Sequence, residues 1–346
     1  MIRLNNIQIS SLILILLVFV NCKNNNSTSS DLVLIENKTN KISDSLSSTS
    51  TENIELDNQN NQKYNNLNIY PFSGYDKKES VSTGFIPLTD SFPWSDNKDS
   101  IVIAKEFIGD NIKTRFHILK SEFRKRFLKI CKIKESDNVY IYNYEIDSTY
   151  IFKVSELPIL AHITQYNSDD EPCEKEEYLI GFDLESKFNL NNKTSYYNAL
   201  VFVGNENIFN ENKLKPILWN VVDSKNFQNI KTKLKLNNLK INKLYKYQMN
   251  EMDYFLINQN RLIIIDTKNN ETLIDTTFEE GESASFAPLS FVGKKNENQF
   301  TQWTGNLFKN KPPVFFGFMY ESFGCESINF IEKQGDTIYI KCDNRH

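Results

Sequence analysis

Short runs of alternating aromatic and aliphatic residues dominate the chain from Tyr70 onward, and this pattern is typical of β-strands. Two pairs of runs are separated by turn-forming residues and predict β-hairpins, and three single runs predict short buried strands. The hairpin pairs are 139–144 with 150–154 and 261–266 with 271–276, and the single runs are 179–182, 199–203 and 314–318. We therefore expect a mainly β fold of antiparallel sheets and hairpins, sandwich-like or propeller-like, with one or a few helices.

One helix is predicted between Phe116 and Ile130, where apolar residues recur with a spacing of three and four. Basic residues fill the remaining positions of this segment: Lys120, Arg124, Lys125, Arg126 and Lys129. We interpret it as a helix that packs on a sheet and exposes a solvated basic face. The alternative is a basic surface for anionic lipid or polymer, and the same two interpretations apply to the Lys-rich stretch 231–246.

The first 66 residues do not share the strand pattern. Arg3 is followed by an almost unbroken apolar run at 9–20, a length that suits the core of a signal peptide and is short for a membrane span. Cys22 comes directly after it, and the next eight residues are polar. An apolar run that ends at a cysteine and precedes a polar tether resembles the signal of bacterial lipoproteins, in which signal peptidase II makes the cysteine the first mature residue.

That resemblance implies acyl chains on Cys22, and each buried CH₂ group adds about 0.8 kcal/mol to membrane anchoring. Phe19 and Asn21 depart from the family pattern, which prefers Leu three residues before the cysteine and a small residue directly before it. An ordinary secretory signal and an uncleaved N-terminal anchor are the alternatives. All three interpretations export the chain, and we expect it in the cell envelope, lipid-anchored to a membrane.

The expected organisation is a signal peptide at 1–21, the lipidated cysteine with a disordered tether at 22–66, and a mainly β globular region at 67–346. The tether is rich in Ser, Thr, Asn, Asp and Lys, and it lacks the apolar surface that would offset its ordering entropy. About 40 flexible residues span roughly 35 Å. The net charge of −4 is nearly balanced, with 40 basic and 44 acidic residues, so no nucleic-acid partner is indicated.

Four cysteines remain after Cys22, and an even number in an exported chain indicates disulfides. Residues 326–331 and 336–341 read as two strands joined by a four-residue turn. This register places Ile328 opposite Tyr339 and Cys325 opposite Cys342, about 4.5 Å apart at Cα, which permits a disulfide between the two cysteines. Cys131 and Cys173 then pair by elimination, and two buried free thiols are the alternative.

The sequence contains no motif that indicates a particular reaction, a metal site or a cofactor. The three histidines, His117, His162 and His346, show no paired spacing that would indicate a transition-metal site. Segment 95–98 matches fragments of penicillin-binding motifs but reads as a surface turn. The acidic segments 169–177 and 279–282 read as solvated loops, although oxygen-rich loops can hold Ca²⁺.

Trp303 is the candidate ligand-binding residue, because an exposed tryptophan in a polar setting can stack on a sugar, but core packing is the favoured interpretation for each of the three tryptophans. The leading hypothesis is a non-catalytic envelope lipoprotein that binds or supports an unknown protein or polysaccharide partner. A surface glycan-binding module built around Trp303 is the first alternative. A hydrolase of envelope or extracellular polymers is the second, and it requires two carboxylates about 5–9.5 Å apart in a cleft.

Overall fold

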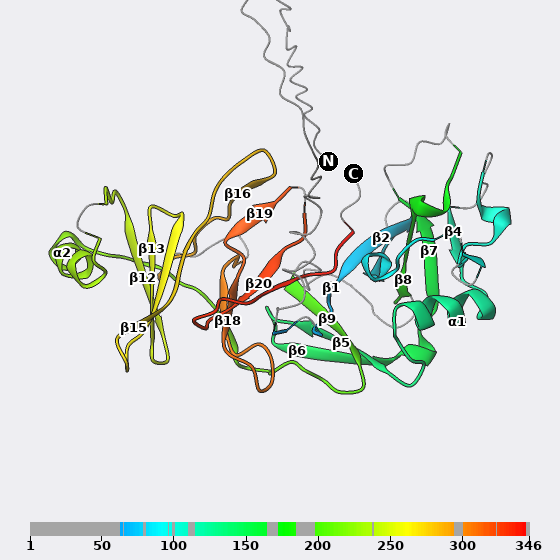
Figure 1. The fold of residues 1–346 in the computed structure, drawn as a ribbon, viewed down its shortest axis with the longest axis horizontal. Helices are drawn as coiled ribbons and strands as arrows, with labels where there is room; N and C mark the ends of the chain where they lie inside the picture. Colours follow the sequence, from blue (N-terminus) through cyan, green and yellow to red (C-terminus); the bar gives the residue numbers. More distant parts are fainter. Residues whose placement is uncertain are drawn as a thin grey trace, which may run out of the picture. The chain divides into compact units, whose positions relative to one another are not determined.

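The computed structural model describes residues 63–343 with gaps at 65, 79–80, 96, 99–100, 110–114, 165–171, 185–197, 237–238, 294–299 and 323. In this part of the chain, antiparallel strands form five sheets and two α-helices are present, α1 (Ser121–Ile130) and α2 (Ser224–Lys233) (Figure 1). The predicted mainly β, antiparallel fold with a few helices is confirmed. The signal segment 1–21 and Cys22 lie outside the described residues.

Four larger sheets and one small sheet carry the fold. Sheet I has the strand order β2-β3-β8-β7-β4, sheet II β1-β9-β5-β6, sheet III β10-β17-β18-β20-β21 and sheet IV β11-β12-β13-β14-β15, and β16 pairs with β19. The strands are β1 (Ile69–Pro71), β2 (Ser73–Lys78), β3 (Val81–Pro87), β4 (Phe116–Ile118), β5 (Asn138–Asn143), β6 (Ser148–Lys153), β7 (Ile159–Ile163), β8 (Tyr178–Asp183), β9 (Ala199–Gly204), β10 (Leu214–Pro216), β11 (Asn220–Val221), β12 (Leu244–Met249), β13 (Met252–Ile257), β14 (Arg261–Asp266), β15 (Glu271–Thr277), β16 (Ala284–Phe286), β17 (Trp303–Gly305), β18 (Val314–Phe316), β19 (Met319–Glu321), β20 (Ser327–Phe330) and β21 (Thr337–Tyr339). Short 3₁₀ turns are η1 (Thr89–Ser91), η3 (Lys105–Phe107), η4 (Val154–Glu156) and η5 (Lys175–Glu177).

Both predicted hairpins form, as β5–β6 and β14–β15. Their turns use the residue types that tolerate left-handed backbone, with Asp147 at φ 53° and Asn270 at φ 50°. The three single apolar runs also form strands, as β8, β9 and β18. Alternating apolar positions flanked by turn residues were therefore sufficient to locate these elements.

The predicted helix is shorter than its apolar spacing indicated. Phe116 belongs to strand β4, whose backbone pairs with β7 at the edge of sheet I, so the start of the segment is extended. The helix begins only at Ser121, and Phe127 and Leu128 bury its apolar face. The prediction was wrong for 116–120 because long-range strand pairing overrides the local helical pattern.

The strands of sheets II and III are apolar on both faces because each of these two sheets is covered on both sides. In β5 of sheet II, Val139 and Ile141 join the core shared with sheet I, whereas Tyr140 and Tyr142 join the core shared with sheet III. The faces of sheets I, II and III therefore pack on one another as in a β-sandwich.

The same alternation continues beyond sheet III. In β18, Val314 and Phe316 face the core shared with sheet II, and Phe315 faces the core shared with sheet IV. Sheet IV then uses its opposite face, with Ile263 and Ile265, to pack against the region of α2. A buried hydrogen bond of 2.9 Å joins the hydroxyls of Tyr254 and Thr304 and ties sheet IV to sheet III.

Two residues that precede the expected boundary at 67, Lys63 and Tyr64, make contacts with distant segments. Tyr64 is buried and its ring contacts that of Phe330, with centroids 4.0 Å apart. The Lys63 ammonium forms an ion pair of 2.7 Å with Glu332. These contacts join the two residues to the last hairpin of the chain.

The disulfide between Cys325 and Cys342 is present, as predicted, but the strand register differs by one residue. Ile328 faces Ile338 rather than Tyr339. After Ile340 the chain leaves the hairpin, since the Cys342 amide donates to the Ile340 carbonyl in a tight turn. The turn takes up one residue and brings Cys342 to Cys325 despite the shifted register.

Cys131 and Cys173 do not pair. Both are free, buried thiols in the core between sheets I and II. Cys131 follows the last turn of α1, and Cys173 forms an isolated antiparallel bridge with Gly109. The prediction by elimination was wrong because an even number of cysteines says nothing about the distance between them in the fold. Burial raises the pKa of the free Cys131 thiol to about 12.

Candidate functional site

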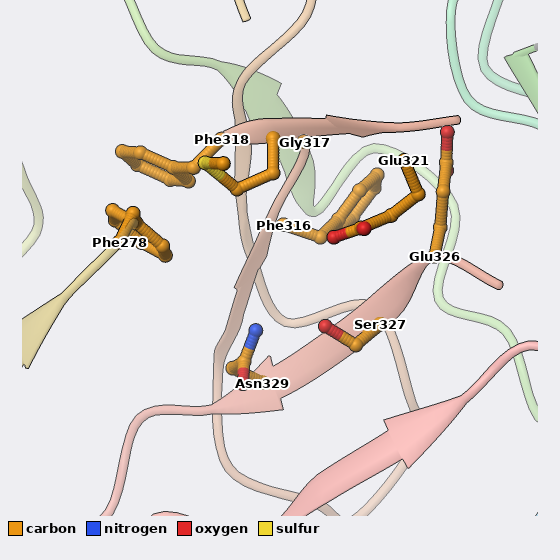
Figure 2. Close-up of a pocket in the computed structure, with 9 residues that line it drawn as sticks. Phe278, Phe316, Gly317, Phe318, Glu321, Glu326, Ser327 and Asn329 are labelled. Atoms are coloured by element: carbon orange, nitrogen blue, oxygen red, sulfur yellow. The ribbon is translucent and has the colours of Figure 1, made fainter. Parts of the chain in front are cut away.

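A pocket of about 150 Å³ lies where the end of β15, the turn from β18 to β19, and the start of β20 meet. Its walls combine aromatic rings with polar and acidic groups (Figure 2). The lining residues are Phe278, Phe316, Gly317, Phe318, Met319, Glu321, Glu326, Ser327 and Asn329. A concave site with apolar walls and a few convergent polar groups is the usual form of a ligand-binding site.

The turn at Gly317 determines the shape of this pocket. Gly317 has a φ of +78°, and a Cβ atom at this position would overlap the carbonyl oxygen of Thr301. Only glycine satisfies both conditions without strain. The turn ends β18 and directs Phe318 away from the line of sheet III into the core shared with sheet IV.

The aromatic wall is held in place by stacking. The Phe318 ring lies almost parallel to that of Phe278, with centroids 5.1 Å apart and an interplanar angle of 13°. Phe315 and Trp219 meet Phe318 edge-on at 5.8 and 6.3 Å. Figure 2 shows Phe278 and Phe318 together at one side of the pocket, away from Glu326. Such packed rings form a rigid apolar surface.

The polar wall comes from alternate residues of β20. Ser327 and Asn329 line the pocket, whereas Ile328 and Phe330 are buried in the core shared with sheet II. The Asn329 side-chain oxygen accepts a 2.9 Å hydrogen bond from the Thr337 hydroxyl, which orients the amide. Tyr339, an exposed aromatic residue, is the strand partner of Ser327. Because facing residues of paired strands project to the same side of a sheet, Tyr339 lies on the same side as the polar wall.

Two carboxylates belong to the same pocket, Glu321 at the end of β19 and Glu326 directly before β20. Glu321 and Glu326 are both exposed residues, at the rim of the pocket. Partial burial of the Glu326 carboxyl raises its pKa, and the negative charge of Glu321 raises it further. The field of Glu326 in turn contributes to the raised pKa values of Tyr144 and Tyr320.

No basic side chain compensates these charges in the pocket wall, since none of the nine lining residues is Lys, Arg or His. The ion pairs formed among the described residues involve other acidic groups. Cys325, next to Glu326, is bound to Cys342, so the disulfide holds the start of β20 at the rim. The site is therefore small, partly aromatic and negatively charged.

Trp303, the predicted ligand-binding residue, is not at this surface. It is 3% exposed, lies in β17 between β10 and β18, and meets the ring of Tyr144 edge-on. Its neighbours Gln302 and Thr304 are also buried and bond to groups inside the protein. The favoured interpretation, core packing of Trp303, is confirmed, and the alternative of an exposed sugar platform is wrong because polar neighbours in a sequence do not guarantee exposure.

The other residues singled out from the sequence do not form a reactive centre. Ser95 lies in a loop, where its hydroxyl accepts from the Asn97 amide at 3.2 Å. His162 stacks on Tyr75, and His117 stacks on Phe107 with centroids 4.0 Å apart. Burial lowers the pKa of His117 to about 4. His346 lies outside the described residues.

Among the described residues, no group of three or more His, Cys, Asp or Glu side chains could hold a metal ion. Part of the acidic segment 169–177, namely 169–171, lies outside them. Segment 279–282 forms a turn region, with a bridge between Gly281 and Ala284. No helix in the described part of the chain is long and apolar enough to cross a membrane.

Sequence reasoning missed both glutamates and the phenylalanines of the pocket. They come from segments 278, 316–321 and 326–329, and no spacing motif joins these segments. The one local signal was the position of Glu326 directly after Cys325. Comparison of the chain with protein-family models, with curated proteins and with solved structures finds no match. The site is therefore interpreted from its own chemistry.

Proposed function

We propose that this chain is an exported, lipid-anchored protein of the cell envelope whose folded region binds a small ligand without transforming it. The observation that carries the proposal is the pocket with convergent aromatic and acidic walls between β15, β19 and β20. A pure scaffold needs an exposed contact patch and has no use for a pocket of this kind. Binding therefore agrees better with the geometry than a purely structural role.

The N-terminal segment supports the anchored location. The apolar run at 9–20, Cys22 and the polar segment after it have the order that acylated lipoproteins use. A single acyl chain anchors a protein reversibly, and two or more anchor it stably. The segment between Cys22 and Lys63 then serves as the tether between the membrane and the folded region.

Replacing the acylated residue tests the anchor. Cys22→Ala removes the thiol that accepts lipid, so we expect the protein to move from the membrane fraction to the soluble fraction. Ser27→Ala, a small change in the same polar segment, is the matched control and should stay with membranes. Unchanged membrane retention of Cys22→Ala would contradict the lipoprotein proposal.

Filling the pocket tests the binding function. Ser327 lines the pocket, and Ser327→Phe places a ring in a volume of about 150 Å³. We expect small saccharides, amino acids or alkylammonium salts to shift NMR signals of pocket residues in the wild type and not in this variant. Ser155→Phe, at an exposed position in η4, is the control. If none of these compounds shifts the pocket signals, the binding proposal fails.

Glycoside hydrolysis is a second candidate, favoured by one observation. A carboxyl with a raised pKa beside a second carboxylate is the arrangement of a general acid and its partner. Hydrolysis predicts release of reducing sugar from envelope polysaccharide, and loss of that activity in both Glu321→Gln and Glu326→Gln. The binding proposal predicts no turnover by the wild type, so one reducing-sugar assay separates the two functions.

A further inference from the structure

We propose that the pocket recognises an organic cation, with an ammonium group held between Glu321, Glu326 and the phenylalanine wall. This inference rests on the proposed binding function and adds the chemical class of the ligand. It follows from three properties of the described residues: charge, ring surface and volume.

The charge of the pocket favours a cation. Two carboxylates belong to the wall, and no lining residue carries a positive charge. Both glutamates are exposed, and the charge of Glu321 disfavours the ionised form of Glu326, so a bound ammonium group would relieve the repulsion between them. The two carboxylates would repel an anionic ligand such as a phosphate, and the lining has no Arg or Lys side chain to bind it.

The apolar wall is suited to the same ligand. The faces of aromatic rings attract cations within about 6 Å of the ring centroid, and quaternary ammonium groups are commonly bound in aromatic sites. Phe278, Phe316 and Phe318 belong to the lining, and Phe278 is half-buried whereas Phe316 and Phe318 are buried in the adjoining cores (Figure 2). The stacking of Phe278 on Phe318 keeps this surface in place without the ligand. Alkyl groups on the nitrogen would contact these rings and the Met319 side chain.

The volume limits which part of a ligand enters. About 150 Å³ is smaller than the roughly 300 Å³ at the lower end of sites for drug-sized molecules. A single head group such as trimethylammonium or a protonated amine suits this space better than a whole sugar ring with its hydroxyl shell. The remainder of the ligand would extend over the rim, on the side where Tyr339, the strand partner of Ser327, is exposed.

Proton linkage follows from the same geometry. The groups that face Glu326 are Glu321 and Tyr320 of the β19 strand and Tyr144 after β5. A cation in the pocket favours the ionised form of Glu326 and therefore lowers its pKa. Binding releases a proton where Glu326 is partly protonated, and affinity rises as the pH increases through the raised pKa of Glu326.

The experiment compares choline with 3,3-dimethylbutan-1-ol, which has the same shape and lacks the charge. Full-length protein in detergent is titrated with each compound by calorimetry and by NMR of the pocket residues. We expect choline to bind at least tenfold more tightly than the neutral alcohol. Glu326→Gln and Glu321→Gln should each reduce choline affinity about tenfold, and Glu251→Gln, an exposed glutamate in the β12–β13 turn, should leave it unchanged.

The outcomes distinguish the inference from the proposed function. Equal binding of choline and the alcohol, or binding of N-acetylglucosamine in place of choline, would overturn the cation inference and leave a ligand-binding pocket. Choline affinity that persists in both glutamine variants would also overturn it, because the carboxylates would then not be responsible. Failure of every probe to bind would overturn the inference and the proposed function together.

Discussion

The disulfide between Cys325 and Cys342 should contribute a measurable part of the stability. It closes a loop over a sequence separation of 17, which includes the whole β20–β21 hairpin. The chain-entropy relation gives about 3 kcal/mol for a loop of this length. The double variant Cys325→Ala/Cys342→Ala should therefore lose about 3 kcal/mol of unfolding free energy, and the loss should fall on the end of sheet III, where fraying is otherwise expected.

Urea unfolding followed by tryptophan fluorescence measures this loss. Reduction of the wild type with dithiothreitol should lower the midpoint as the double variant does, whereas the variant should not respond to the reductant. Amide exchange of Ser327 should become faster because the bond next to Glu326 holds the start of β20. A change below about 1 kcal/mol, or a reductant effect on the double variant, would refute the reasoning.

Two further predictions concern single residues. His117→Phe should reduce the loss of stability on acidification, because burial lowers the pKa of His117 from 6.5 to about 4. The folded wild type therefore loses up to about 3 kcal/mol of unfolding free energy as the pH falls from 6.5 to 4. Urea unfolding at pH 7 and at pH 4.5 measures this loss, and an unchanged pH dependence in the variant would refute the prediction. Gly317→Ala should cost at least about 2 kcal/mol in thermal unfolding, because φ is +78° and the new Cβ would overlap Thr301, whereas Gly281→Ala, with open space around it, should be nearly neutral.

The local elements of the fold could be predicted from the sequence because they depend on near neighbours. The hairpin at β5–β6 follows from alternating residues on each side of Asp147, which adopts the left-handed conformation of the turn. The disulfide was predicted by placing Cys325 opposite Cys342 across a hairpin, although the register was one residue off. The tight turn after Ile340 corrected the spacing, and a strict alternation pattern does not contain such a turn.

The arrangement of the sheets and the pocket could not be predicted because both depend on contacts between distant segments. Tyr140 and Ile141 are adjacent but belong to different cores, which is visible only when the stacking of the sheets is known. Trp303 is buried because its face of sheet III packs on sheet II, where its ring meets that of Tyr144. Glu326 and Phe278 line the same pocket only because sheet IV packs on sheet III.

The most direct test of the ligand site is the titration of Glu326 by NMR of ¹³C-labelled glutamate carboxyls, with and without choline. We expect the pKa of Glu326 in the free protein to lie above the ordinary value of 4.5 and to fall when choline saturates the pocket. Glu321→Gln should lower the pKa of Glu326 in the free protein by removing the neighbouring charge. A Glu326 pKa at its ordinary value, with no response to choline, would contradict the account.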